Sequence, residues 1–225
     1  MPRQSGSKAR AAACAALLVA ACAEAPAAPA SASLRFDDVF ASARPESLHY
    51  TATFAAAPGK PDRMEGWRDG DARVKRRTGD ALESYAVRSP GGEQYDLTML
   101  DLQRKLLTRI TRTNLYRLGN FTDWFDLAHA LRHPKGDYQL AAGQRPAGVG
   151  PAVAPCTWFD LAQQGRTAHI CWSARAQLPL RIVDAGGRTV WNVTRLDLGP
   201  VADTVFRIDA RDYVQVDANQ DMERD

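Results

Sequence analysis

The sequence has little net charge, which argues against a nucleic-acid-binding role. Its 29 Lys and Arg residues exceed its 26 Asp and Glu residues by three, for a formal charge of +3. Arg3, Lys8 and Arg10 lie in the first ten residues, so the rest of the chain is neutral. Domains that bind phosphate backbones carry a clustered basic excess. A short basic run at 73–77 places alternate cations on one strand face, which is typical of a solvated surface; contact with anionic lipid headgroups is the alternative.

The chain also lacks the local motifs of common enzyme classes. It contains no G-x-S-x-G elbow, H-E-x-x-H helix, P-loop or dinucleotide fingerprint. His129 and His133 have the i, i+4 spacing of a helical metal pair, but no Glu follows His129 and Pro134 comes directly after His133. We therefore predict a protein that is not an enzyme and that uses no metal or cofactor. A Ser-His-Asp site assembled only by folding leaves an envelope hydrolase as the third alternative.

Long hydrophobic runs are missing as well. The only extended one, residues 11–21, is about half as long as a membrane-spanning helix and follows a basic start, so residues 1–21 are predicted to be a signal peptide. The run ends in Val19-Ala20-Ala21-Cys22, which resembles the bacterial lipobox and predicts lipidation at Cys22. Ordinary cleavage within 23–32 is the alternative and would leave a soluble periplasmic protein.

Residues 22–33 continue from this cysteine as an Ala-, Pro- and Ser-rich stretch without bulky side chains, which predicts a flexible tether. Because Ala23 follows the cysteine, the lipobox resemblance implies an outer-membrane lipoprotein of the bacterial cell envelope that faces the periplasm. The chain from 34 to 225 is then a single folded domain held to the membrane through its acyl anchor.

Cysteine is scarce beyond this leader. Cys14 and Cys22 belong to the leader and lipobox, and Cys156 and Cys171 remain. An even pair in an oxidising compartment predicts a disulfide, here across the hairpin that Gln163-Gln164-Gly165-Arg166 indicates. A metal pair or a reactive dithiol is the alternative, although no C-x-x-C motif is present.

Alternating apolar and polar residues dominate the rest of the chain. Residues 48–54 alternate strictly, as a half-buried antiparallel strand does. Similar runs occur at 64–68, 72–78, 82–88, 93–100, 105–112, 156–162, 166–173, 179–184 and 188–196. Short strands at this spacing, without strand-helix-strand alternation, predict a mainly β, α+β fold built on a curved antiparallel sheet. The Pro- and Gly-rich residues 144–155 are predicted to be a surface loop.

Two segments show helical periodicity. In residues 122–132, Trp124, Leu127 and Leu131 share one face, with Thr122 as the expected cap and Pro134 beyond the end. Residues 33–43 show the same pattern, with Ser33 as the cap and Pro45 as the stop. Each helix needs an apolar surface to cover, and the sheet provides one.

This order of elements resembles the bacterial periplasmic proteins of the LolA and LolB type, which carry lipoproteins to the outer membrane. The resemblance rests on the lipobox, an N-terminal helix, a long antiparallel meander, a mid-chain helix and the late hairpin that begins at Leu178-Pro179-Leu180-Arg181. It spans about residues 34–216, and block 157–208 looks like that superfamily's ending. It implies a half-barrel whose concave face, covered by helices, holds acyl chains. The Cys156–Cys171 pair departs from this pattern, and no defined ligand-contact residue maps across.

A cleft between helix and sheet would bind a lipid or another hydrophobic ligand, and that is the predicted function. The candidate lining residues are apolar or aromatic positions of the predicted helix and strands: Phe54, Trp67, Tyr95, Leu97, Trp124, Leu127 and Leu131. The alternative is that these residues form a sealed core. In that case the protein is a structural or interaction module, without a ligand cavity, that docks another envelope protein.

Overall fold

The computed structural model describes residues 34–41, 44–57, 60–89, 91–92, 94–111 and 123–217. The predicted signal peptide, Cys22, the predicted tether and the expected helix caps Ser33 and Thr122 lie outside these residues. Among the described residues, no helix has the length and hydropathy needed to cross a membrane.

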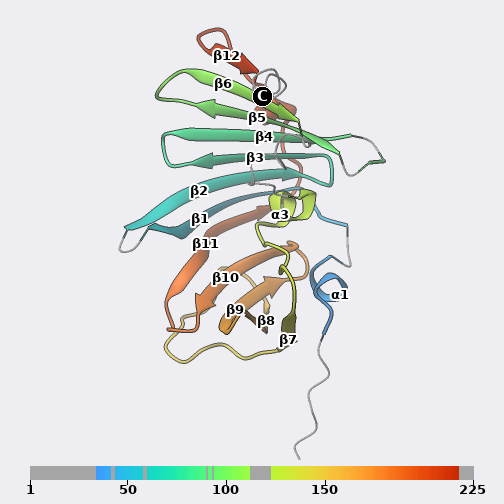
Figure 1. Cartoon of the computed structure of the whole chain (residues 1–225), viewed down its shortest axis with the longest axis vertical. Helices are drawn as coiled ribbons and strands as arrows, with labels where there is room; N and C mark the ends of the chain where they lie inside the picture. The colour runs from blue at the N-terminus through green and yellow to red at the C-terminus, as the bar shows by residue number, and fades with distance from the viewer. Residues whose placement is uncertain are drawn as a thin grey trace, which may run out of the picture. The chain divides into compact units, whose positions relative to one another are not determined.

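A single sheet of twelve strands contains most of the described chain (Figure 1). The strand order is β12-β6-β5-β4-β3-β2-β1-β11-β10-β9-β8-β7. Neighbours pair antiparallel except β12, which runs parallel to β6. The strands are β1 (Leu48–Ala57), β2 (Lys60–Asp69), β3 (Arg73–Thr78), β4 (Leu82–Arg88), β5 (Tyr95–Asp101), β6 (Leu106–Thr111), β7 (Tyr138–Ala142), β8 (Thr157–Gln163), β9 (Arg166–Ser173), β10 (Leu178–Asp184), β11 (Thr189–Leu198) and β12 (Val214–Asp217).

The mainly β prediction is confirmed, and the alternating runs mark their strands closely. β4 and β9 have the predicted bounds, and the loop expected at 144–155 separates β7 from β8. Two strands were not predicted. β7 has five residues and β12 has four, so each carries too short a run for alternation to identify it; in β7 only Leu140 is buried, and Val214 of β12 is 64% exposed. Both lie at sheet edges and depend on a single partner strand.

The helices are shorter than predicted. α1 (Phe36–Phe40) has five residues, and α3 (Trp124–His129) has six. The prediction that the second helix extends to Arg132 is wrong because Ala130 adopts a left-handed conformation, with φ 52°, which ends α3. Helices of this length extend about 8–9 Å, whereas twelve strands span about 50 Å. They therefore contact only part of the sheet.

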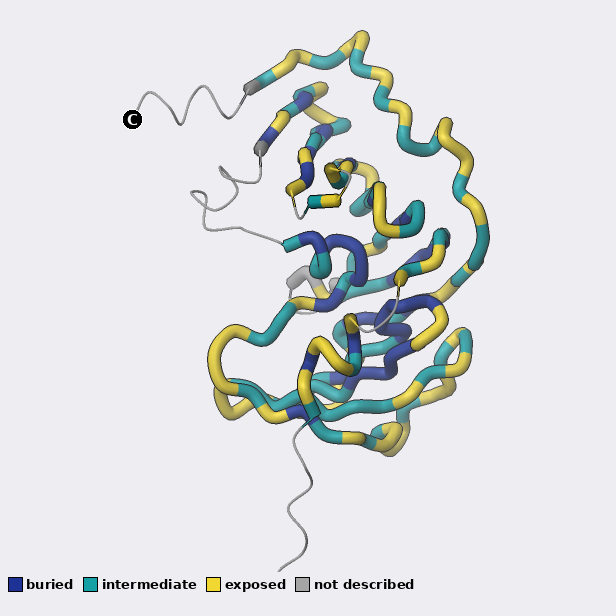
Figure 2. The backbone as a smooth tube through the Cα atoms, turned by 90° about the vertical axis from the view of Figure 1, so that its right-hand side faces the viewer, coloured by how far each residue is buried: buried dark blue, intermediate teal, exposed yellow. Residues whose placement is uncertain are grey.

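The strand register separates two faces of the sheet. We call inner the face that carries a buried row of directly paired residues from β1 to β6: Leu48, Arg68, Val74, Ala86, Leu97 and Ile110. The next residue along each strand forms a row on the outer face: His49, Trp67, Lys75, Tyr85, Thr98 and Arg109. Figure 2 shows the resulting interleaving of buried and more exposed positions.

The segment that follows β11 crosses the outer face. It contains the short helix η1 (Asp203–Phe206) before it reaches β12. Arg73 of β3 holds it: its guanidinium bonds Asp203 at 2.6 Å and lies 4.5 Å from the Phe206 ring centroid. The chain thereby connects two strands, β11 and β12, that have six other strands between them in the sheet order.

Candidate functional site

Helix α3 and the strands beneath it form the candidate site. The Asp123 side chain accepts a hydrogen bond from the Asp126 backbone N–H at 2.7 Å, which caps the start of the helix. One helical face then turns toward the inner face of β3–β6. It packs in a buried cluster made of Val74, Ala86, Tyr95, Leu97, Ile110, Trp124, Leu127 and Ala128.

Four of the seven predicted lining residues meet in this cluster: Tyr95, Leu97, Trp124 and Leu127. Their side chains pack against one another, and each is between 2% and 9% exposed. The rings of Tyr95 and Trp124 lie 5.8 Å apart, and the Trp124 indole N–H donates to Asp71 at 2.8 Å.

The other three predicted residues lie elsewhere. Leu131 packs in a separate cluster with Phe36 and Phe40 of α1. Phe54 contacts a third cluster that includes Tyr50. Trp67 lies on the outer face, where it stacks on His49 with 5.0 Å between ring centroids. The structure therefore does not bring all seven residues to one wall.

Arg68 of β2 is the residue of this site that sequence reasoning missed. It is 1% exposed, yet it forms no ion pair with a carboxylate of the described residues. Its guanidinium donates five hydrogen bonds, of 2.5–3.1 Å, to four backbone carbonyls: those of Glu46, Ala128, Ala176 and Gln177. Burial lowers the pKa of Arg68 to about 10.

A second arginine reinforces this contact. Arg76 of β3 lies on the same face as Arg68, and its Nη2 donates to the backbone carbonyls of Asp126, at 3.0 Å, and Leu127. Arg68 reaches the next carbonyl, that of Ala128, at 2.8 Å. Two adjacent strands thus hold the last turn of α3 by its backbone, where the helix dipole favours a cation.

The two histidines with metal-like spacing do not face each other. His129 is buried, and its Nδ1–H donates to the Gln177 carbonyl at 2.7 Å. Burial, together with the nearby Arg68 charge, lowers the pKa of His129 to about 4, so the ring is neutral at pH 7. His133 instead contacts carboxylates of α1 and α3: Asp37 at 3.1 Å, Asp123 at 2.9 Å and Asp126 at 3.4 Å.

Asp123, Asp126 and His133 bring ligand-type atoms within 4.8 Å of one another. Two of these carboxylates already accept hydrogen bonds from backbone N–H groups. Asp123 accepts from Asp126 at the start of α3, and Asp126 accepts from His133 at 3.0 Å. Burial raises the pKa of Asp126. Because His133 also contacts Asp37 of α1, these three residues connect α3 and the segment after it to α1.

A histidine–carboxylate pair also occurs on the sheet. His169 and Asp160 are direct cross-strand partners on β9 and β8, and His169 Nδ1 lies 2.7 Å from Asp160 Oδ1. Within the described residues, no Ser, Thr or Cys side chain hydrogen-bonds either group. The pair has an orienting carboxylate and a potential base, but it lacks a nucleophile in contact.

Comparisons with known proteins leave the family open. No protein-family model and no curated protein matches the chain. Among solved structures, one described as the structure of PNGF-II in the P21 space group aligns with 81% of this chain at 8% sequence identity and a TM-score of 0.30. This chain spans about a third of that protein, 33% of its length.

Proposed function

We propose that the protein is a non-enzymatic lipoprotein of the bacterial cell envelope, which binds a lipid or another hydrophobic ligand between α3 and a half-barrel sheet. The observation that carries this proposal is the way in which α3 is attached. A two-turn helix lies on an apolar sheet face, and the described polar contacts between this helix and the sheet include two strand arginines bonded to helix backbone. Separation of this helix would break the hydrogen bonds that Arg68 and Arg76 donate to it but no pairing between strands, so the bound ligand has to compensate for those hydrogen bonds.

The energetics favour an acyl chain as the ligand. Lifting α3 exposes Trp124, Leu127 and Ala128 together with the strand residues beneath them. Each large apolar side chain that is exposed costs about 1.5–3 kcal/mol. For the six large side chains of this cluster the loss is at least about 9 kcal/mol, and an acyl chain recovers about 0.8 kcal/mol per buried methylene, so at least about 11 methylenes are needed to offset it. A short polar ligand offers no such compensation.

Extraction and mass spectrometry of the protein purified from native envelopes test this proposal. We expect co-purifying lipid and saturable binding of a fluorescent fatty acid. Leu127→Gln places a polar amide under α3 and should weaken that binding severalfold. The matched control is Val87→Gln, because Val87 is 49% exposed on the outer face. Absence of both lipid and fatty-acid binding contradicts the proposal.

One observation favours the alternative function, an interaction module. The four clustered lining residues are packed by the protein's own side chains. If that packing never opens, the exposed outer face and the sheet edges remain as docking surfaces for another envelope protein. Crosslinking in intact cells separates the two functions: recovery of one stoichiometric partner, combined with no fatty-acid binding, supports the module.

The proposed location rests on the leader. A lipidated Cys22 followed by a tether at 22–33 would place residues 34–225 beside the outer membrane, facing the periplasm. The Cys156–Cys171 disulfide in the structure is compatible with an oxidising compartment.

A further inference from the structure

A polar hollow lies on the outer face of the sheet, away from α3. Its cavity volume is about 640 Å³, within the range typical of small-molecule sites. The loop between β7 and β8 forms one wall and the strands β1, β10 and β11 form the other, with these lining residues: Thr53, Ala147, Gly148, Val149, Gly150, Arg181, Gly187, Thr189 and Asn192. Arg181 is the single formally charged residue among them.

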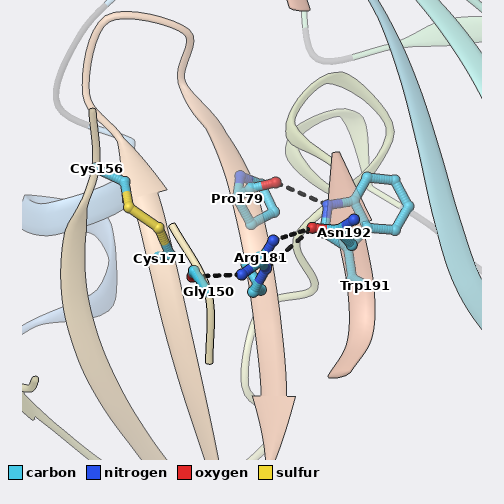
Figure 3. Close-up of a disulfide and its surroundings, with 7 residues drawn as sticks. All are labelled: Gly150, Cys156, Cys171, Pro179, Arg181, Trp191 and Asn192. Atoms are coloured by element: carbon cyan, nitrogen blue, oxygen red, sulfur yellow. Dashed lines mark hydrogen bonds between the residues drawn. A yellow bond between two sulfur atoms is a disulfide. The ribbon is translucent and has the colours of Figure 1, made fainter. Parts of the chain in front are cut away.

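Arg181 is held in one orientation. Its Nε and Nη2 donate to Asn192 Oδ1 at 2.9 and 2.7 Å, and its Nη1 donates to the Gly150 carbonyl at 2.6 Å (Figure 3). These bonds use three of the five guanidinium N–H groups, and no described carboxylate forms an ion pair with the remaining charge. The Asn192 amide N–H₂ likewise has no acceptor among the described residues. Fixed donors are therefore available beside the hollow.

The loop wall is fixed in place as well. The Cys156–Cys171 disulfide ties its end to β9, and the Gly143 N–H donates to the Trp158 carbonyl at 2.9 Å near its start. Ala152 and Ala154 pack against the buried cluster that contains Cys171. Gly148 has a positive φ of 76°, a conformation that bulkier residues rarely adopt. Binding a ligand here would not require the whole loop to become ordered.

The surrounding charges favour an anion. Direct pairing across the strands places four residues in one row: Arg181, Asn192, Thr53 and Arg63. Arg63 is exposed and adds a second positive charge beyond the hollow. The carboxylate of Asp184 in the nearby β10–β11 turn is already neutralised by Arg188, with a contact of 3.1 Å. The hydrogen bond from the Arg188 backbone N–H lowers the pKa of Asp184, with smaller contributions from the Arg188 side chain and the Gly186 N–H.

We infer that this hollow binds the phosphoryl group of a small organic phosphate. The free guanidinium N–H groups and the Asn192 amide would donate to phosphoryl oxygens, and Thr53 and Thr189 also line the hollow. The volume leaves room for an organic substituent beyond the phosphoryl group. The same chemistry is found in a soluble phosphate ester and in a phospholipid headgroup. This site is separate from the proposed acyl-binding face.

Calorimetric titration of the purified full-length chain tests the inference with three probes: inorganic phosphate, glycerol 3-phosphate and phosphatidylglycerol vesicles. We expect glycerol 3-phosphate to bind at one site and Arg181→Gln to weaken it at least about tenfold. Arg181→Lys keeps the positive charge but loses the planar guanidinium with its fixed N–H donors, so it should also weaken binding. The matched control is Arg195→Gln, which removes an exposed arginine of β11 that pairs with Asp197 outside the hollow.

The probes also identify the source of the phosphoryl group. Equal affinity for inorganic phosphate indicates a free-phosphate site, and binding only to vesicles indicates a headgroup site. In the unsubstituted protein, titration must shift the Nε–H resonance of Arg181, a readout that does not depend on how a variant folds. No saturation with any probe by about 10 mM, or equal affinity of Arg181→Gln and the unsubstituted protein, overturns the inference.

Discussion

Arg68 shows how one buried side chain can hold several segments together. Its guanidinium connects strand β2 to α3, to the turn before β10 and to the segment before β1, in each case through a backbone carbonyl. A carbonyl carries no charge, so burial of the cation is compensated by five hydrogen bonds rather than by an ion pair. Removal of the Arg68 side chain would leave each of the four carbonyls without this donor.

We therefore predict that Arg68→Leu is strongly destabilising. Each buried carbonyl left without a donor costs about 1–3 kcal/mol, so the free energy of unfolding should fall by more than about 3 kcal/mol. Urea denaturation measures this change. Arg68→Lys, with three donors, should lose less than Arg68→Leu. Arg195→Leu, at an exposed position, is the control and should change stability by less than about 0.5 kcal/mol. A loss in Arg68→Leu no greater than in this control contradicts the assignment.

His129 predicts a pH dependence of stability. Its pKa is about 4 in the folded protein and about 6.5 when unfolded, so between these values the unfolded state binds more protons. The free energy of unfolding therefore rises with pH through this window, and the contribution of neutral His129 to it is complete above about pH 6.5. The difference corresponds to about 3 kcal/mol lost on acidification to pH 4.

Unfolding measurements at several pH values between 4 and 7 test the role of His129. His129→Gln keeps a donor for the Gln177 carbonyl but does not titrate, so its stability should depend less on pH than that of the unsubstituted protein. His169→Gln is the matched control because His169 is more exposed and pairs with Asp160. Identical pH profiles for His129→Gln and the unsubstituted protein would show that His129 does not contribute.

At the scale of elements, local alternation predicted strands well and helix lengths poorly. Strands such as β4 and β9 pair with chain neighbours, so their pattern and their partners are both local. β12 pairs in parallel with β6, about a hundred residues earlier, and nothing in its own four residues indicates that partner. The apolar stripe that suggested a helix to Arg132 continues in Leu131, but Leu131 follows the left-handed Ala130 and joins another cluster.

The sequence pattern indicated some residues of the candidate site under α3 but missed others. Of the seven residues predicted to line a cleft, four, Trp124, Leu127, Tyr95 and Leu97, pack in one buried cluster, and their role as a ligand wall stays a prediction. Arg68 was missed because a cation in a strand ordinarily faces solvent, and its acceptors are backbone carbonyls that only folding places around it. The alternation in β2 instead drew attention to Trp67, the large apolar residue of the opposite face. Sequence pattern indicates which face is apolar, but it does not indicate which polar group is buried within that face.

The predicted disulfide is confirmed, and its effect is local to one loop. Cys156 and Cys171 are bonded with a Cα–Cα distance of 5.4 Å, and their sequence separation is 15. Replacing both with Ser should lower the free energy of unfolding by about 3 kcal/mol, because the unfolded chain regains loop freedom. Thermal unfolding with and without reductant measures this change. The double variant should not respond to reductant, and an unchanged melting temperature in the reduced protein contradicts the prediction.

At the scale of the whole molecule, the two proposed sites lie on opposite faces of one sheet. A ligand under α3 changes the contacts of the inner face, whereas a phosphate ester beside Arg181 contacts only the outer face and the disulfide loop. Arg181→Gln should therefore leave fatty-acid binding unchanged, and Leu127→Gln should leave glycerol 3-phosphate binding unchanged. The two functions can thus be separated by single substitutions, and the failure of one proposal leaves the other standing.

The proposed membrane anchor is the last feature that concerns the whole molecule. If Cys22 carries acyl chains, Cys22→Ser removes the site to which they are attached. The protein should then move from the membrane fraction to the soluble periplasmic fraction, because the acyl chains are what hold it at the membrane. Fractionation followed by immunoblotting measures the change. Cys14→Ser is the matched control, because Cys14 lies inside the predicted leader and should leave the distribution unaltered. Retention of Cys22→Ser in the membrane fraction would show that something other than this cysteine holds the protein there.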